Sequence, residues 1–227
     1  MELPYYIREA IENEINNYKK EEKERELNRI KSKLKLNPQT NRYDYDGDLD
    51  RDIVSNFVSE DKDGFIINFG KVTGDFSCYK LGLTSLKGAP TEVGWSFYCD
   101  RNQLTSLEGA PKIVGENFYC ANSKLTSLEG APHTVGGDFY CYGNKLTSLE
   151  GAPQEVGGSF ICYDNQITSL KGAPQKVRGS FICSNNKLTS LKGAPQKVGG
   201  IFSCHSNPNL HSLDGIGEVR GDIVKDF

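Results

Sequence analysis

The stretch FYCDRNQLTSLEGAP, which begins at Phe97, returns as FYCANSKLTSLEGAP at Phe118, as FYCYGNKLTSLEGAP at Phe139 and as FICYDNQITSLKGAP at Phe160. A fixed period of this kind predicts a solenoid, in which each repeat buries its apolar side only against its neighbours. All seven cysteines of the 227-residue chain follow the same period of 21 residues, at Cys78, Cys99, Cys120, Cys141, Cys162, Cys183 and Cys204.

A single repeat predicts a short strand followed by a tight turn. The alternation in Phe97–Cys99 places Phe97 and Cys99 in the core and Tyr98 on the outside, as a strand requires. Three residues after the cysteine, Asn102 is expected to turn its amide inward and to bond backbone groups where the strand ends. The same asparagine recurs in four later repeats, at Asn144, Asn165, Asn186 and Asn207.

The whole pattern predicts an α/β-type repeat solenoid built on a curved parallel β-sheet. About eight strands are expected, from Phe76–Cys78 to Ile223–Lys225. Gly-Ala-Pro segments should carry the chain over a short, irregular convex side, because proline fixes φ where no regular ladder is needed. Lys225 takes the cysteine position of the last strand, where a charge discourages further pairing at an open sheet edge.

The cysteines are best explained as a free, buried ladder. Cysteine is a small, polarisable core residue, and copying one packed layer copies it. A zinc site would need closely paired cysteines of the C-x-x-C type, which the sequence lacks. Neighbouring coils of a parallel sheet lie about 4.8 Å apart, which is inside the Cα range of a disulfide. Oxidation in vitro therefore stays open as an alternative.

The repeat motifs resemble those of a known family. F-x-C-x-x-N-x-L-x-x-L matches the leucine-rich-repeat pattern, and LTSLEGAP is similar to the short repeats of bacterial LPX-type leucine-rich-repeat effectors. The fuller unit LTSLEGAP-x-x-VGG-x-FYC-x-x-N-x and the lead-in FGKVTGDFSC resemble leucine-rich-repeat proteins of large tailed phages. The resemblance covers residues 65–227 and implies the fold and a role in protein interaction. The catalytic domain that often follows the effector repeats is not seen here, so we expect no ligase activity.

Residues 1–36 are predicted to be helical and to form a separate segment. They are rich in Glu, Lys and Arg, and after Pro4 they contain neither glycine nor proline. Apolar residues fall at helical spacing near both ends, whereas KKEEKERE between them has none. One long helix or two are expected, either capping the solenoid or acting as a coiled-coil or partner-binding arm. The apolar positions are Ile7, Ile11, Ile15 and Tyr18, then Leu27, Ile30 and Leu34.

Residues 37–64 are predicted to be an acidic linker and N-terminal capping region before the solenoid at residues 65–227. Pro38 marks the end of the helix. The Asp44–Asp52 stretch partly matches a calcium-binding loop, but Arg42 and Ile53 would occupy the first and last loop positions, where calcium needs carboxylates. We therefore expect a polar capping strand and turn. Cation binding by this stretch stays open, as does a first coil starting near Leu49 or near Ile53.

Functional residues are expected where the strands face outward, because core positions repeat for packing alone. These outward positions are rich in tyrosine and isoleucine, and a contiguous apolar strip is typical of an interaction surface. The alternative is that aromatic and β-branched residues only stabilise the sheet by cross-strand pairing. The orientation of Trp95, the only tryptophan, stays open. The predicted binding strip consists of Tyr79, Tyr98, Tyr119, Tyr140, Tyr142, Ile161, Tyr163, Ile182 and Trp95.

Other functional classes find little support in the sequence. The net charge of −3 argues against a general nucleic-acid-binding surface, and no apolar run approaches the roughly 20 residues that span a bilayer. His133, His205 and His211 fall in different columns, and adjacent strand residues such as Cys204 and His205 point to opposite faces. We expect no catalytic residue, no metal site and no cofactor. The absence of a Sec-type signal and the odd cysteine count favour a cytoplasmic location.

These observations predict a non-enzymatic protein–protein interaction module. By resemblance it is phage-encoded and binds a host or phage protein on the concave face of the solenoid, with inhibition of a host defence protein as one outcome. The alternative is a structural or assembly protein, in which residues 1–36 drive self-association and the repeats serve as a rigid spacer.

Overall fold

The computed structural model describes residues 5–227, with side chains for all of these except residues 5–11, 13–15, 17 and 23. The chain forms two compact units, one that ends at Lys35 and one that covers Leu36–Phe227. The first unit consists of one helix, α1 (Tyr5–Lys33), so the predicted helical segment is a single helix. Of its predicted apolar positions, Ile7, Ile11 and Ile15 lie outside the described side chains, and Tyr18 is exposed.

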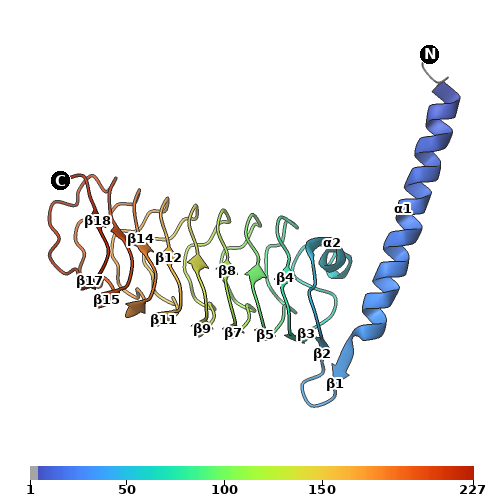
Figure 1. Cartoon of the computed structure of the whole chain (residues 1–227), viewed down its shortest axis with the longest axis horizontal. Coiled ribbons are helices and arrows are strands. Elements are labelled where there is room, and N and C mark those ends of the chain that lie inside the picture. The colour runs from blue at the N-terminus through green and yellow to red at the C-terminus, as the bar shows by residue number, and fades with distance from the viewer. Residues whose placement is uncertain (1–4) are drawn as a thin grey trace. The chain divides into compact units, whose positions relative to one another are not determined.

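The second unit is a β-solenoid of 21-residue coils with two parallel sheets (Figure 1). One sheet has eight strands, which confirms the predicted number. They are β4 (Phe76–Ser77), β6 (Phe97–Tyr98), β8 (Phe118–Tyr119), β10 (Phe139–Tyr140), β12 (Phe160–Ile161), β14 (Phe181–Ile182), β16 (Phe202–Ser203) and β18 (Ile223–Val224).

The second sheet has ten strands and was not predicted. The sequence predicted an irregular convex side, and in this part of each coil a valine that recurs every 21 residues forms a buried ladder. The strands are β1 (Lys35–Asn37), β2 (Arg42–Tyr45), β3 (Phe69–Val72), β5 (Glu92–Val93), β7 (Ile113–Val114), β9 (Thr134–Val135), β11 (Glu155–Val156), β13 (Lys176–Val177), β15 (Lys197–Val198) and β17 (Glu218–Val219).

A three-residue corner joins the two sheets within each coil, and its first residue is glycine in most coils. A Cβ atom on Gly115 would lie 1.9 Å from the carbonyl oxygen of Gly94 in the preceding coil. Only glycine lets the two backbones approach so closely. The corner therefore explains the glycine that follows the valine in most repeats.

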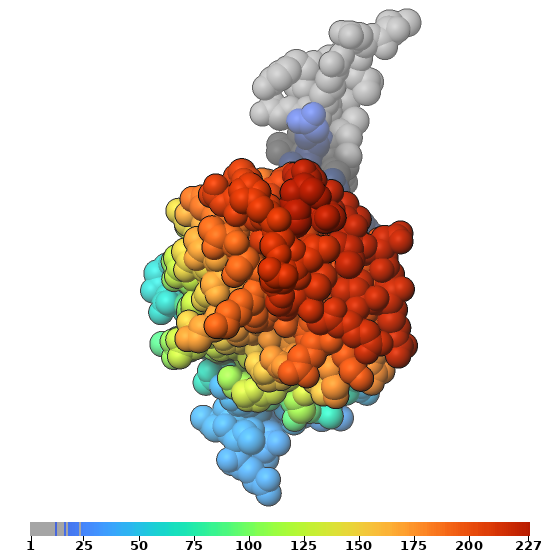
Figure 2. All heavy atoms as spheres, turned by 90° about the vertical axis from the view of Figure 1, so that its left-hand side faces the viewer, coloured from blue at the N-terminus to red at the C-terminus, as the bar shows by residue number. Residues whose placement is uncertain are grey.

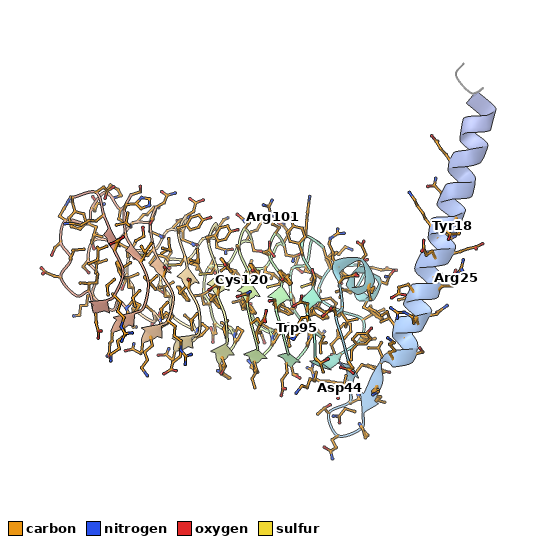
Figure 3. All side chains as sticks on the ribbon, viewed as in Figure 1. Tyr18, Arg25, Asp44, Trp95, Arg101 and Cys120 are labelled. Carbon is orange, nitrogen blue, oxygen red and sulfur yellow. The ribbon has the colours of Figure 1, made fainter. Side chains whose placement is uncertain are left out.

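The interior consists of uniform columns, as predicted. Neighbouring phenylalanine rings stack with centroids 5.2–5.6 Å apart, from Phe76 to Phe202. All seven cysteines are free and buried, and Figure 3 shows Cys120 inside a coil. Burial raises the pKa of the Cys120 thiol well above its ordinary value of 9.0, so these thiols stay protonated and inert at neutral pH.

The asparagine column forms the predicted ladder at the end of the eight-stranded sheet. Asn144 Nδ2 donates to the carbonyl oxygens of Cys120 and Cys141, at 3.0 Å each. Its Oδ1 accepts from the backbone N–H groups of Ser123 and Leu125, at 3.1 Å each. One side chain thus satisfies four backbone groups of two coils where the strand ladder stops. The same arrangement recurs, with one or two N–H groups bonded to Oδ1, at Asn102, Asn165, Asn186 and Asn207.

The two ends of the solenoid differ. At the N-terminal end Leu49 pairs with Phe76, so the first coil starts at Leu49, followed by α2 (Arg51–Val54) and η1 (Ser55–Phe57). Edge-to-face contacts of Phe57, Phe65 and Phe69 close the phenylalanine column there. At the other end β18 is exposed on the last coil, drawn in red in Figure 2. Lys225 follows β18 directly, and its ammonium group lies 4.7 Å from the centre of the Phe227 ring.

Candidate binding surface

Five of the predicted tyrosines come together on the outward side of the eight-stranded sheet. Tyr98, Tyr119 and Tyr140 form a stacked row with centroids 4.7 and 4.6 Å apart. Tyr142 and Tyr163 form a second stack at 4.7 Å, and Tyr142 meets Tyr140 edge to face at 6.5 Å. These five residues, here called the tyrosine cluster, make one continuous set of ring contacts across four coils.

The remaining members of the predicted strip lie around this cluster. Ile161 and Ile182 continue the column of Tyr140 toward the C-terminus, and both are half-buried. Tyr163 is the most exposed ring of the cluster, at 36%. Tyr79 lies at the N-terminal end of the sheet and is half-buried. The strip is therefore a partly buried surface.

Trp95 does not belong to this surface. It occupies the corner between β5 and β6 and is 53% exposed, so it faces out (Figure 3). The backbone N–H of Trp95 donates to Gly74 O and its carbonyl accepts from Glu116 N–H. Among the described residues, no ring contact joins Trp95 to the tyrosine cluster. The sequence grouped it with the strip because the corner could not be located.

Three hydroxyl groups of the tyrosine cluster have raised pKa values. Tyr140 Oη donates to Asp138 Oδ2 at 2.7 Å. Burial, and next the hydrogen bond to the Asp138 carboxylate, raise the pKa of Tyr140 above its ordinary value. Burial likewise raises the pKa values of Tyr119 and Tyr163, and it raises the pKa of the Asp100 carboxyl beside them. Tyr119, Tyr140 and Tyr163 therefore present neutral hydroxyl groups near neutral pH.

A second polar ladder runs along the edge of this surface and was missed in the sequence. From Asp75 to Ser180, the residue that precedes the strand phenylalanine of each coil accepts a hydrogen bond from the backbone N–H of the equivalent residue one coil later, at 2.6–3.3 Å. The sequence does contain a column of short polar residues at these positions, but Asp, Asn and Ser are also the residues that are common in turns. The acceptors are Asp75, Ser96, Asn117, Asp138, Ser159 and Ser180.

The opposite edge carries a column of left-handed backbone, also unpredicted. In the later coils Asn, Asp, Gly or Ser take this position, which suits such residues. In the coils of β4 and β6 this position holds Lys80 (φ 53°) and Arg101 (φ 54°), and both side chains are exposed. A non-glycine residue in this region costs about 1 kcal/mol or more. The two basic residues lie one position beyond Tyr79 and Asp100.

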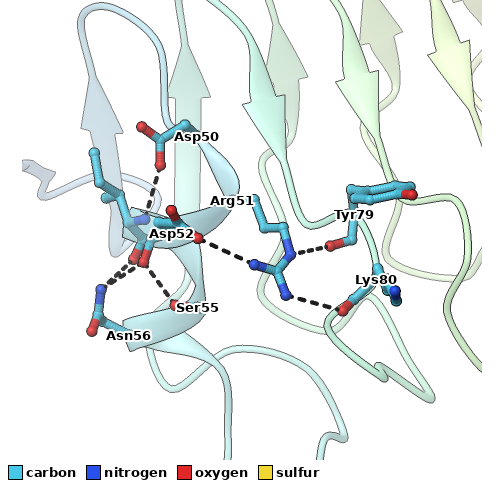
Figure 4. A network of polar contacts seen from close by, with 8 residues as sticks. Asp50, Arg51, Asp52, Ser55, Asn56, Tyr79 and Lys80 are labelled. Atoms are coloured by element: carbon cyan, nitrogen blue, oxygen red, sulfur yellow. Dashed lines mark hydrogen bonds and ion pairs between the residues drawn. The ribbon is translucent and has the colours of Figure 1, made fainter. Parts of the chain in front are cut away.

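The Asp44–Asp52 stretch acts as a cap, as the sequence favoured. Asp44 Oδ1 accepts from Lys71 N–H, and Asp48 Oδ1 accepts from Asp75 N–H. Asp50 caps α2 by accepting from Ile53 N–H at 3.0 Å (Figure 4). These carboxylates satisfy backbone donors of the first coils, which explains their alternate spacing in the sequence.

A pocket of about 370 Å³ opens where the tyrosine row ends. Arg51 bonds to Tyr79, one of the residues that line the pocket. Its Nε donates to Tyr79 O at 2.9 Å, and its Nη1 pairs with Asp52 Oδ1 at 3.1 Å (Figure 4). The guanidinium of Arg51 is thereby bonded to a backbone carbonyl and to a carboxylate, and Arg51 is not among the lining residues. The pocket is lined by Asp48, Asp50, Asp75, Ser77, Tyr79 and Tyr98.

The described side chains assemble no cluster of three or more His, Cys, Asp or Glu residues that would hold a metal ion. Cys204 is buried and His205 exposed, with His205 Nδ1 3.0 Å from Ser206 Oγ, so the neighbours face opposite ways as expected. Of the residues that the structure describes, none lies in a helix with the length and apolar character needed to cross a membrane.

Comparison of the chain with protein-family models, with curated proteins and with solved structures found no match. The solenoid fold is thus defined by the structure, and the resemblance of its motifs to leucine-rich repeats of tailed phages stays a prediction.

Proposed function

We propose that this protein is a non-enzymatic protein–protein interaction module that binds its partner through the tyrosine cluster. One observation carries the proposal: five tyrosines from four successive coils meet in continuous ring contact on the outward side of one sheet. Tyrosine supplies large contact area and a hydroxyl at low entropic cost, and it is frequent among interface anchors.

The ten-stranded sheet weakens the alternative that these rings only stabilise strands. Its outward positions have the same backbone and the same need for cross-strand pairing, yet they carry ion pairs instead of rings. Lys176 lies 3.1 Å from Glu155, and Lys71 lies 3.4 Å from Glu92. Parallel pairing in this fold therefore does not require aromatic residues on the outside.

The binding mode would use a preformed surface. The rings are fixed by stacking and by the Tyr140–Asp138 hydrogen bond, so little side-chain entropy remains to be lost on association. A leucine-rich-repeat affiliation, a phage origin and a host target rest on the motif resemblance alone. A reducing, cytoplasmic setting is supported by the seven unpaired thiols.

The assembly alternative has no comparable support among the described side chains. Within α1, Glu21 forms an ion pair with Arg25, and Glu26 forms one with Arg29. Such pairs stabilise a solvated helix surface and do not build an association seam. Self-association through residues 1–36 stays a prediction, which light scattering on the full chain would test.

The test compares two triple variants with the wild type in pull-downs from candidate host lysates, quantified by mass spectrometry. One variant changes the tyrosine row, Tyr98→Ser, Tyr119→Ser and Tyr140→Ser. The matched control changes outward positions of the other sheet, Ile113→Ser, Thr134→Ser and Glu155→Ser. Both must keep the wild-type circular dichroism spectrum. We expect a partner retained by the wild type and the control to be lost by the tyrosine variant. Equal retention by all three proteins would remove the cluster from the binding site.

A further inference from the structure

The outward strand positions around the tyrosine row carry carboxylates as well as aromatic rings. Between Asp75 and Ser184, the outward positions of the eight-stranded sheet include Asp75, Asp100 and Asp138 and no lysine, arginine or histidine. An aromatic surface with fixed carboxylates complements a cation on an apolar stem, because ring faces and carboxylates both attract positive charge.

The tyrosine row has one open end. Tyr98 stacks on Tyr119 on one side, but on the other side the equivalent residue is Ser77, which has no ring. Leu49 pairs with Phe76, so Asp50 continues the same column one coil further. The outer face of the Tyr98 ring and the Asp50 carboxylate therefore bound the pocket, and Ser77 lies between them.

In three carboxylates of this pocket, one oxygen accepts a hydrogen bond and the other does not. Asp48 Oδ1 accepts from Asp75 N–H, Asp75 Oδ1 accepts from Ser96 N–H, and Asp50 Oδ1 accepts from Ile53 N–H. The second oxygen of each has no hydrogen-bond partner among the described residues. The first hydrogen bond fixes each carboxylate in place, so the free oxygens are preorganised acceptors.

The spacing of these acids favours an extended cation over a metal ion. The described side chains form no group of three acids close enough to coordinate one ion. The pocket, at about 370 Å³, has room for a whole side-chain head group. A guanidinium is planar, stacks on aromatic faces and reaches several carboxylate oxygens through its fork of donors. Lysine has the charge but neither the plane nor the fork.

We propose that the partner inserts an arginine side chain into this pocket, with the guanidinium stacked on Tyr98 and bonded to the free oxygens of Asp48, Asp50 and Asp75. This inference rests on the proposed function, since the rest of the partner segment would lie along the tyrosine row. The nearest basic residues do not occupy the pocket: Arg51 is bonded to Asp52 and to backbone carbonyls.

The test uses the full-length protein and immobilised, end-capped peptide mixtures that differ only in one fixed central residue: arginine, lysine, citrulline or leucine. Citrulline has the shape of arginine without its charge. Wild type is compared with an Asp48→Asn, Asp50→Asn, Asp75→Asn variant, in which each amide oxygen can keep the structural hydrogen bond. The charge-matched control is Asp214→Asn, Asp222→Asn, Asp226→Asn at the other end of the solenoid.

We expect wild type and control to retain the arginine mixture roughly tenfold or more over citrulline, with lysine between them, and the pocket variant to lose that preference. Absence of an arginine preference in the wild type, or an unchanged preference in the pocket variant, would overturn the inference. If the tyrosine variant still loses its protein partner while arginine is not selected, the proposed function survives and the arginine site does not. If arginine is selected but the partner is retained by the tyrosine variant, the proposed function fails instead.

Discussion

The eight-stranded sheet carries a row of stacked rings on each side, and the two rows behave differently. The inner row of phenylalanines runs without interruption from Phe76 to Phe202, with centroids 5.2–5.6 Å apart. The outer row of tyrosines is packed at least as closely, at 4.6–4.7 Å, but it spans only Tyr98 to Tyr140. The same backbone then continues with Ile161 and Ile182.

This difference separates packing from binding. The inner row must be uniform, because each ring fills the space between its two neighbours and no solvent is available to fill a gap. The outer row begins and ends while the coils remain in register, so the backbone does not require it. Changes to the inner row should therefore cost stability, whereas changes to the outer row should cost binding.

The largest expected effect comes from the inner row. Phe139→Ala should lower the free energy of unfolding by about 3–5 kcal/mol, because it leaves a cavity between Phe118 and Phe160. Urea denaturation followed by circular dichroism measures it. The matched change on the outer side, Tyr119→Ala, should cost well under half as much. Equal losses for the two variants would contradict the division into a packing row and a binding row.

Next in size is the asparagine ladder. Asn144→Ala should cost about 3 kcal/mol, because it strands four backbone groups that were bonded by one side chain. Asn144→Ser should cost less, since the chain itself accommodates Ser123 at the same position one coil earlier, where Ser123 Oγ accepts from Asn102 N–H. If the alanine and serine variants unfold at the same urea concentration as wild type, the ladder does not stabilise the strand ends.

Because the cysteine thiols are buried, we expect the folded protein to lose stability at alkaline pH. Burial raises the pKa of Cys141 above its ordinary 9.0, so below about pH 9 both the folded and the unfolded chain keep the proton. Above that pH only the unfolded chain releases it, and stability falls as pH rises. Each buried thiol should add about 1.4 kcal/mol per pH unit to this slope.

Melting temperatures measured under reducing conditions between about pH 9 and pH 10 report this slope. Tyrosines with raised pKa values add a slope of the same sign, so the thiol contribution is taken from the difference between wild type and Cys141→Ala. Cys141→Ala should show a shallower slope than wild type, although it is less stable at neutral pH. An identical slope in both proteins would show that the thiols ionise freely in the folded state.

The smallest expected effect is that of a single outer hydroxyl. Tyr140→Phe removes the hydrogen bond to Asp138 and keeps the stacked ring, so it should cost about 1 kcal/mol or less. Chemical denaturation measures this loss. A loss as large as that of Phe139→Ala would place Tyr140 in the structural core instead of the binding surface.

The interior could be predicted from the sequence because it repeats. A cysteine every 21 residues fixed the coil length, and the alternation around Phe97 placed Tyr98 outside. An extra residue before Leu210 and a shortened last unit cancel, so Phe202 still pairs with Ile223. Uniform packing thus leaves a periodic signal that survives small changes of length.

The corners and edges could not be predicted, because their signals are local and ambiguous. The two-residue strand Glu92–Val93 is too short to show alternation. Asp75 and its equivalents resemble turn residues until the neighbouring coil supplies the N–H groups they accept. Arg101 gives no hint of left-handed backbone, since arginine rarely adopts it. Predicting the pocket at Tyr98 would have required the position of Asp50, and that position depends on where the first coil starts.

The most direct measurement of the central claim is site-specific photo-crosslinking in cells that contain the partner. A photoreactive phenylalanine analogue replaces Tyr119 in one protein and Ile113, on the outward side of the other sheet, in a second. We predict that position 119 captures a discrete protein partner and that position 113 does not. Capture of the same partner with equal yield from position 113, or none from position 119, would contradict binding through the tyrosine cluster.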